Sequence, residues 1–271
     1  MIRLNDSEFE QMVAYMREHY GINLDKKQVL IECRMSKVLE NRGLSSYDKY
    51  LEQLKTDRDG VMAEELVDRL TTNYTYFMRE PDHFQVLEAH IFPEVLAQQT
   101  VRDYQIWCAG CSTGEECYTL AMVLNECRDK LETSRSAKIL ATDISDEVLM
   151  KARSGTYPMK ALTGLPQAWQ MKYCRQEKDK SFTMAPELKA DIRFQKHNLM
   201  ERPPYPERFD MIFCRNVMIY FDKAAKERLI RQLEDCLNPG GYLFVGHAEL
   251  LSGNDTRLTQ VYPAVYCKKT E

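Results

Sequence analysis

The sequence predicts a helical N-terminal domain followed by an α/β domain with a mostly parallel sheet. In the first 70 residues, apolar side chains recur at helical spacing and no strand-like alternation occurs. From about residue 100, short apolar strands alternate with amphipathic helices, a pattern typical of βαβ units. The chain has 271 residues, which accommodates two such units at about 150 residues per domain.

Four helices are expected in the N-terminal domain. Asn5 and Glu8 have the spacing of a capping box, and the apolar stripe that follows them ends at Gly21. The second helix ends before Gly43, and a turn-forming segment separates the third helix from the fourth. The last three helices are expected over residues 27–41, 47–55 and 61–70.

The α/β domain is predicted to consist of four strands and three helices, interrupted by an insert. The insert, at about 167–193, breaks the βαβ rhythm with short apolar-polar stretches that favour a small β excursion. We therefore divide the chain into a helical domain (1–71), a linker with a connecting helix (72–99) and the α/β domain (100–271). Strands are expected over 104–109, 138–142, 209–214 and 242–246, helices over 115–127, 146–153 and 223–237, and a turn over 238–241.

Composition and charge exclude several functional classes. The net charge is −4, whereas a dedicated nucleic-acid binder usually has a basic domain or stripe. No apolar stretch is long enough for a membrane span, and the N-terminus lacks the layout of a secretory signal. The nine cysteines are scattered and odd in number, as expected of reduced thiols in a cytoplasmic protein. We predict a cytoplasmic protein that binds no nucleic acid and is not inserted in a membrane.

The turns that follow the first two strands suggest a ligand site. Ligands of open parallel sheets bind at the carboxyl ends of the strands. The first strand leads into a loop of small residues and two glutamates, 109–116, which would repel a phosphate but suit a cationic ligand. The second strand ends at Asp143, an acid suited to ribose hydroxyls. A cationic nucleoside such as S-adenosylmethionine fits better than NAD or ATP; the alternative is a tight turn with an N-terminal helix acid.

Two further features have simpler explanations. Cys108 and Cys111 have zinc-like spacing, but no second ligand pair follows, so we predict no metal site. The second helix has a basic face, which is either merely solvated or a docking surface for an acidic partner. This face comprises Lys26, Lys27, Arg34, Lys37 and Arg42.

Six segments resemble, in order, motifs of the chemotaxis-receptor protein-glutamate O-methyltransferases of the CheR type. Thr71–Glu80 resembles the family's Thr-Asn-x-Thr-x-Phe-x-Arg-Glu segment, and Ile106–Glu116 resembles its cofactor loop. Met78, Cys117 and Ala248 depart from the usual family residues without removing a group expected at the cofactor. The other four segments are Ala141–Ile144, His197–Leu199, Phe209–Phe221 and Gly246–Glu249.

This resemblance implies a Rossmann-like S-adenosylmethionine-dependent methyltransferase domain with a small β-subdomain insert, preceded by an all-α domain. It implies S-adenosylmethionine as cofactor and S-adenosylhomocysteine as product. Asp143 would accept the ribose hydroxyls, Asn198 would bond the adenine edge, and Arg79 would face the methionyl carboxylate. Glu116 would face cationic or donor groups of the ligand. The implied cofactor contacts are Asn73, Thr75, Arg79, Glu116, Asp143, Asn198, Leu199, Arg215 and Asn216.

The family's substrates are glutamates in the cytoplasmic region of chemotaxis receptors, and a receptor C-terminal peptide is a further candidate partner. A glutamate is already ionised at neutral pH, so catalysis rests mainly on alignment of the reacting atoms. Tyr220 and Arg79 are the residues we expect to orient the acceptor carboxylate. The alternative for Tyr220 is a buried structural role. The alternative function is that of a regulatory protein that binds the cofactor without turnover and signals through its N-terminal helices.

Overall fold

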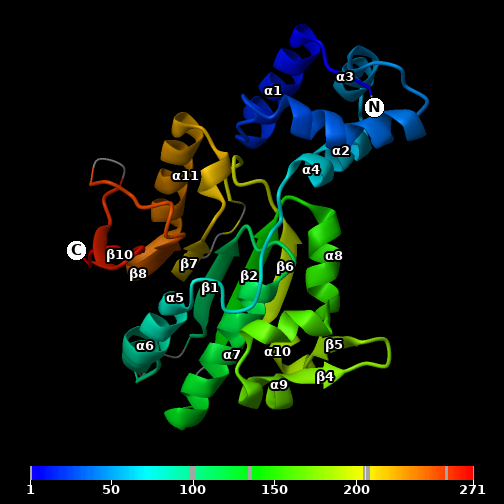
Figure 1. Ribbon diagram of the computed structural model, residues 1–271. Coiled ribbons are helices and arrows are strands. Elements are labelled where there is room, and N and C mark those ends of the chain that lie inside the picture. The colour runs from blue at the N-terminus through cyan, green and yellow to red at the C-terminus, as the bar shows by residue number, and fades with distance from the viewer. Residues whose placement is uncertain are drawn as a thin grey trace.

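The computed structural model describes residues 2–97, 102–133, 136–203, 205, 208–253 and 256–270. A helical N-terminal domain lies at one end of an α/β domain, and the linker runs between them across the sheet (Figure 1). Within these residues, no helix combines the length and apolar character needed to cross a membrane. The division into an all-α and an α/β part confirms the predicted fold class.

The N-terminal domain contains the four predicted helices. Asn5 and Glu8 cap the first helix reciprocally, and Gly21 ends it in the left-handed conformation, with φ of 69°. Met16, Ile31 and other apolar residues from all four helices form a separate core. The helices are α1 (Asp6–Tyr20), α2 (Gln28–Asn41), α3 (Tyr47–Lys55) and α4 (Val61–Leu70).

Arg34 joins α2 to the end of α4. Its Nη1 donates to the carbonyl oxygens of Arg69, Leu70 and Thr71 at 3.2, 3.2 and 2.7 Å. Its Nη2 donates to Thr72 Oγ1 at 3.3 Å. The last carbonyl groups of a helix have no partner within the helix, so this cation caps α4 and fixes the start of the linker.

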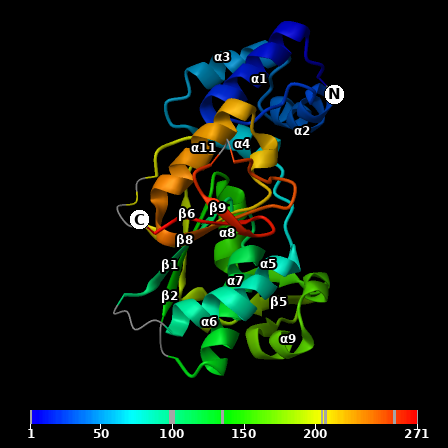
Figure 2. The ribbon, with the colours of Figure 1, turned by 90° about the vertical axis from the view of Figure 1, so that its left-hand side faces the viewer.

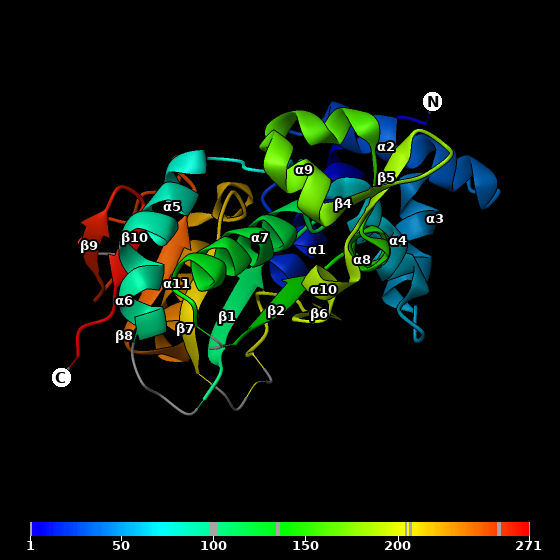
Figure 3. The ribbon, with the colours of Figure 1, turned by 90° about the horizontal axis from the view of Figure 1, so that it is seen from below.

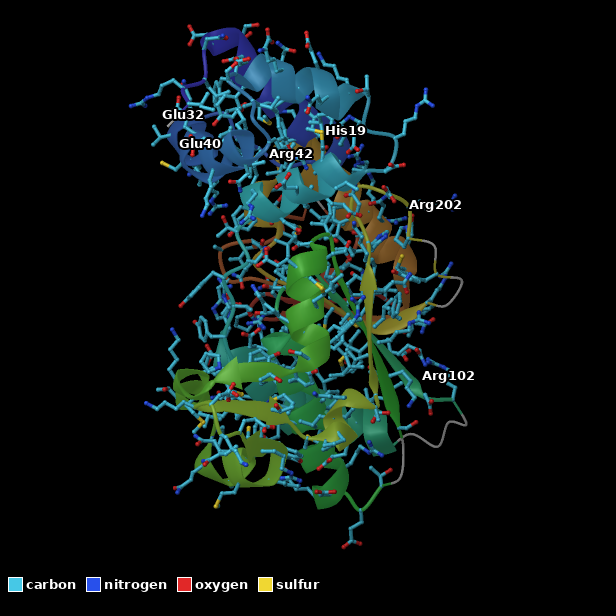
Figure 4. All side chains as sticks on the ribbon, turned by 90° about the vertical axis from the view of Figure 1, so that its right-hand side faces the viewer. His19, Glu32, Glu40, Arg42, Arg102 and Arg202 are labelled. Carbon is cyan, nitrogen blue, oxygen red and sulfur yellow. The ribbon has the colours of Figure 1, made fainter. Side chains whose placement is uncertain are left out.

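The basic face of α2 is therefore smaller than the sequence suggests. Besides Arg34, Arg42 (labelled in Figure 4) is engaged. Its guanidinium pairs with Glu65 at 2.7 Å. Lys26, Lys27 and Lys37 are exposed. Any acidic partner of this face would accordingly meet these three lysines.

After the linker come α5 (Pro81–Val86), η1 (Leu87–Ile91) and α6 (Phe92–Ala97), and then the main sheet. Strands β6, β2, β1, β7 and β8 are parallel, and β10 and β9 add an antiparallel edge. Because β1 pairs with β2 on one side and β7 on the other, the order reverses at β1, where ligands bind in open sheets. The strands in order are β6 (Ile192–Lys196), β2 (Ala137–Asp143), β1 (Tyr104–Ala109), β7 (Phe209–Cys214), β8 (Leu237–Val245), β10 (Val265–Cys267) and β9 (Thr259–Tyr262).

Helices cover both faces of the sheet, as Figure 3 shows. α7 (Glu115–Lys130) and α8 (Asp146–Ser154) lie on one face and α11 (Lys223–Cys236) on the other. Successive strand residues alternate between the two cores: Cys108 packs with the α7 side and Trp107 with the α11 side. Both faces are apolar, which explains the continuous apolar runs in these strands.

The inserted β-subdomain is a separate three-stranded sheet, seen beside α9 in Figure 2. It begins at Thr156, earlier than the predicted insert at 167–193, and Ile192 already belongs to β6 of the main sheet. The predicted turn at 238–241 lies within β8, where Gly240 has a φ of 76° and the pairing with β7 shifts register. The elements of the insert are β3 (Thr156–Pro158), η2 (Met159–Gly164), α9 (Gln167–Tyr173), β4 (Cys174–Gln176), β5 (Ser181–Met184) and α10 (Pro186–Lys189).

We predict that Arg34→Ala destabilises the protein by about 1.5–3 kcal/mol, because carbonyl groups at the end of α4 lose a charged donor. Urea unfolding followed by circular dichroism measures this change. Lys37→Ala, an exposed cation on the same helix, is the control and should change stability by less than about 0.5 kcal/mol. Equal losses in both variants would contradict the capping role.

Candidate functional site

One pocket opens where the carboxyl ends of the central strands meet the linker and the N-terminal domain. Every site residue predicted from the sequence lines it, although the residues come from segments far apart in the chain. Their individual roles stay predictions. The residues are Asn73, Thr75, Arg79, Glu116, Asp143, Asn198, Leu199, Arg215, Asn216 and Tyr220.

The loop after β1 forms the floor of the pocket. The N–H groups of Gly110 and Cys111 both donate to the Thr142 carbonyl, at 2.8 and 2.9 Å, which fixes the turn. Gly110 has a φ of 89°, and a Cβ there would lie 2.4 Å from Cγ2 of Val217. Glycine is therefore required both by the backbone conformation and by the close approach of the next segment.

Asp143 ties this loop to the end of β2. Its Oδ2 accepts the N–H of Ser112 at 2.8 Å, and its Oδ1 accepts the N–H of Ser145 at 3.1 Å. Burial raises the pKa of Asp143, while these backbone donors oppose the rise. Each carboxylate oxygen keeps a second lone pair, so the residue can still accept hydroxyl donors from a ligand.

A buried arginine closes one side of the pocket. The Arg215 guanidinium is 1% exposed and pairs with Glu116 at 2.7 Å and with Glu80 at 3.1 Å. It also donates to the Arg79 carbonyl. Burial alone would raise the pKa of Glu80, but hydrogen bonding and the charge of Arg215 hold it below its ordinary value. The family resemblance implied that Glu116 faces a group of the ligand. In this structure its partner is the Arg215 guanidinium.

Glu249 is a functional residue to which the sequence analysis gave no role. Its carboxylate accepts the N–H groups of Asn216, Ile219 and Gly246 at 2.6, 3.0 and 2.8 Å. These bonds fix the turn that leads into η3 (Met218–Tyr220), the segment that carries Tyr220. The family-like segment Gly246–Glu249 marked this part of the sequence. Its contact with the end of β7 appears only in the folded structure.

The N-terminal domain supplies a wall of the pocket that sequence analysis missed. Its Asn23 N–H donates to the Tyr220 carbonyl at 2.8 Å, and Ile22 forms a bridge with Phe221. Asn198 Nδ2 donates to the His19 carbonyl at 2.8 Å, so this amide joins the domains. Other N-terminal residues on the wall are Tyr20, Leu24, Lys27 and Leu30.

Glu80, His83 and His247 form a cluster next to Arg215, with potential ligand atoms within 4.8 Å of one another. The Glu80 oxygens already accept from Arg215 and Asn216, both at 3.1 Å. A metal ion at this cluster would lie beside the Arg215 guanidinium, and repulsion between the two cations disfavours metal coordination there.

The two parts of the chain match two family models. The model described as "CheR methyltransferase, all-alpha domain" matches residues 7–71. The model described as "CheR methyltransferase, SAM binding domain" matches residues 73–267. The chain belongs to the CheR methyltransferase family. The resemblance found in the sequence is thereby confirmed, as is S-adenosylmethionine as the cofactor of the second domain.

Relatives in this family match over nearly their whole length. A chemotaxis protein methyltransferase of Borreliella burgdorferi is 39% identical, over 98% of this chain and 96% of the relative. The proteins of the same name from Salmonella typhimurium and Escherichia coli are 36% and 35% identical. These alignments cover 93% and 98% of this chain and 86% and 92% of the relatives.

His83 provides a pH test of this part of the site. Its side chain is 1% exposed, and burial, aided by Arg215, lowers the pKa of His83 from 6.5 to about 4. Between these values the unfolded chain binds more protons than the folded one, so stability falls as the pH drops from 6.5 toward 4. We expect this group to contribute a loss of up to about 3 kcal/mol over that range.

Urea unfolding at pH 7 and pH 4.5 measures this dependence, and His83→Gln should flatten it. His19→Gln, which changes an exposed histidine, should leave the slope as in the parent. A parental slope in His83→Gln would show that other groups cause the pH dependence.

Proposed function

We propose that this protein transfers the methyl group of S-adenosylmethionine to glutamate side chains of chemotaxis receptors, forming methyl esters that set receptor adaptation. The observation that carries this proposal is the pocket at the strand-order reversal, in the domain that matches the family's cofactor-binding model. The curated relatives are named chemotaxis protein methyltransferases. The alternative, a regulatory protein without turnover, draws no support from these names.

The residues around the pocket fit this cofactor. Asp143 lines the pocket and has acceptor positions left for ribose hydroxyls beside its bonds to the Ser112 and Ser145 N–H groups. Arg79 would pair with the methionyl carboxylate, and Asn73, Thr75, Leu199 and Asn216 would complete the contacts. When bound, S-adenosylmethionine supplies a methyl group already activated by the sulfonium charge. The protein itself needs to supply binding, orientation and exclusion of water.

Tyr220 is suited to orienting the acceptor. Its backbone is fixed by Asn23 and by the turn that Glu249 holds, while its partly buried side chain lines the pocket. The acceptor glutamate, with a pKa near 4.3, arrives as a carboxylate. A phenol donor and the Arg79 guanidinium would hold that carboxylate in line with the methyl group, and alignment is the main source of rate enhancement here.

We also propose which residues contact the receptor. Lys26 and Lys27, just before α2, and Lys37, within it, are exposed cations that suit an acidic region of a receptor. A receptor C-terminal peptide is proposed as a second partner. We accordingly propose that the protein acts in the cytoplasm, where these receptor regions lie.

The decisive experiment is methyl transfer from labelled S-adenosylmethionine to purified receptor cytoplasmic fragments. We expect label in the fragment that mild base releases, because esters hydrolyse whereas N-methyl groups do not. Fragments in which the acceptor glutamates are replaced by alanine are the control and should stay unlabelled. Cofactor binding without transfer would support the regulatory alternative instead.

The role of Tyr220 is tested by Tyr220→Phe, which keeps the ring. If the hydroxyl orients the acceptor, single-turnover methylation should fall by about 10–1000-fold, while cofactor affinity and melting temperature stay near the parent values. Tyr50→Phe is the matched control: its buried hydroxyl donates to the Met62 carbonyl at 3.2 Å, so its loss should lower stability and leave turnover unchanged. Full turnover in Tyr220→Phe would exclude the catalytic role.

A further inference from the structure

The linker presents two tyrosines to solvent at the mouth of the pocket. Residues 71–76 are extended and alternate in burial, so Asn73 and Thr75 are partly buried while Tyr74 and Tyr76 face outward. Tyr74 is 70% exposed and Tyr76 46%. Of the large apolar side chains found exposed in the described part of the chain, these two are the aromatic ones.

Both rings lie close to the Arg79 guanidinium. The ring centroids are 5.7 Å apart, and the Arg79 Cζ lies 5.9 Å from each of them. Arg79 Nη1 also donates to the Tyr74 carbonyl at 2.7 Å. We call these three residues the mouth cluster. It presents one cation between two aromatic faces, and all three members line the pocket.

The cluster is held in place from behind. Phe77 is 1% exposed and packs against Tyr157 with ring centroids 5.1 Å apart. The Asn73 carbonyl accepts from Ser112 Oγ at 2.8 Å. The linker between these anchors has little freedom, so the tyrosines are ordered at the surface although water surrounds them.

Two exposed rings in a fixed position are typical of a surface that a partner covers, since aromatic residues dominate the binding energy of interfaces. The cation between them selects an anionic partner. The rings line the pocket yet stay largely exposed to solvent, whereas Asn73 and Thr75 are partly buried, which favours contact of the rings with a ligand that arrives from solvent.

We propose that the mouth cluster binds the receptor segment that carries the acceptor glutamate, with Tyr74 and Tyr76 contacting apolar groups beside that glutamate. Arg79 attracts its carboxylate into the pocket. This inference rests on the proposed function and names residues that set its substrate preference. The family segment Thr-Asn-x-Thr-x-Phe-x-Arg-Glu leaves both tyrosine positions open, so side chains there can differ without touching the cofactor residues.

The test is the double variant Tyr74→Ala/Tyr76→Ala, with steady-state methylation of a receptor cytoplasmic fragment. We expect KM for the fragment to rise at least tenfold, kcat to stay within about twofold, and the cofactor Kd from calorimetry to remain unchanged. Tyr74→Phe/Tyr76→Phe should keep the parental KM, since the rings remain. Met171→Ala, which changes a 72% exposed side chain of the insert, is the control and should match the parent.

An unchanged KM in the double variant would overturn the proposal. A weakened cofactor Kd would also overturn it, because the rings would then contact the cofactor. If the double variant does not fold, Tyr74→Ala alone removes the more exposed ring and should raise KM about threefold. Measuring fragment binding by fluorescence anisotropy separates this proposal from the proposed function. If the parent protein binds the fragment without methylating it, the proposed function fails. The mouth cluster is still tested in that case, because the double variant should bind the fragment more weakly than the parent.

Discussion

The pocket depends on one buried guanidinium. Arg215 follows β7, yet its two partners are Glu80 from the linker and Glu116 from α7. It therefore joins the end of β7, the linker and α7 through one side chain. Removal of one member of a buried ion pair leaves an uncompensated charge, and here it would leave two carboxylates facing each other. Arg215 thereby helps to hold the linker segment that carries Arg79, because it pairs with Glu80 and donates to the Arg79 carbonyl.

Further hydrogen bonds connect the linker to both domains. Arg34 fixes the end of α4, the Asn73 carbonyl bonds to Ser112, and the Ser112 N–H bonds to Asp143. The linker is thus a structural part of the site. This explains why an extended segment without regular secondary structure can present pocket residues in a fixed order.

Local sequence signals predicted the four N-terminal helices, and also β1, β2, β7 and β8 with α7, α8 and α11, because the physics of those elements is local. The capping box of α1 and the stop at Gly21 depend on residues within a few positions of one another. β6 was missed because its short apolar run lies directly after the insert, and only its pairing with β2 identifies it. The turn expected at 238–241 lies within the bounds of β8, but these four residues have no partner in β7, since the pairing passes from Leu237 directly to Tyr242.

The sequence predicted which residues form the site, but it did not predict the hydrogen-bond partners of their side chains. Motif order identified the residues that line the pocket. It could not reveal that Asn198 bonds to the His19 carbonyl, or that Arg34 is engaged at the end of α4, because these contacts join distant positions. Side-chain partners depend on how two domains pack, and no local pattern records that packing.

The close contact of Gly21 with the α/β domain limits how this fold can diverge. A Cβ at Gly21 would lie 2.5 Å from Sδ of Met200, where the N-terminal domain touches the segment after β6. The Met200 thioether could shift to make room, but the φ of 69° at Gly21 would still strain any other residue there. Chimeras that exchange N-terminal domains between homologues should therefore keep a glycine at this position, even though the exchanged domain has a core of its own.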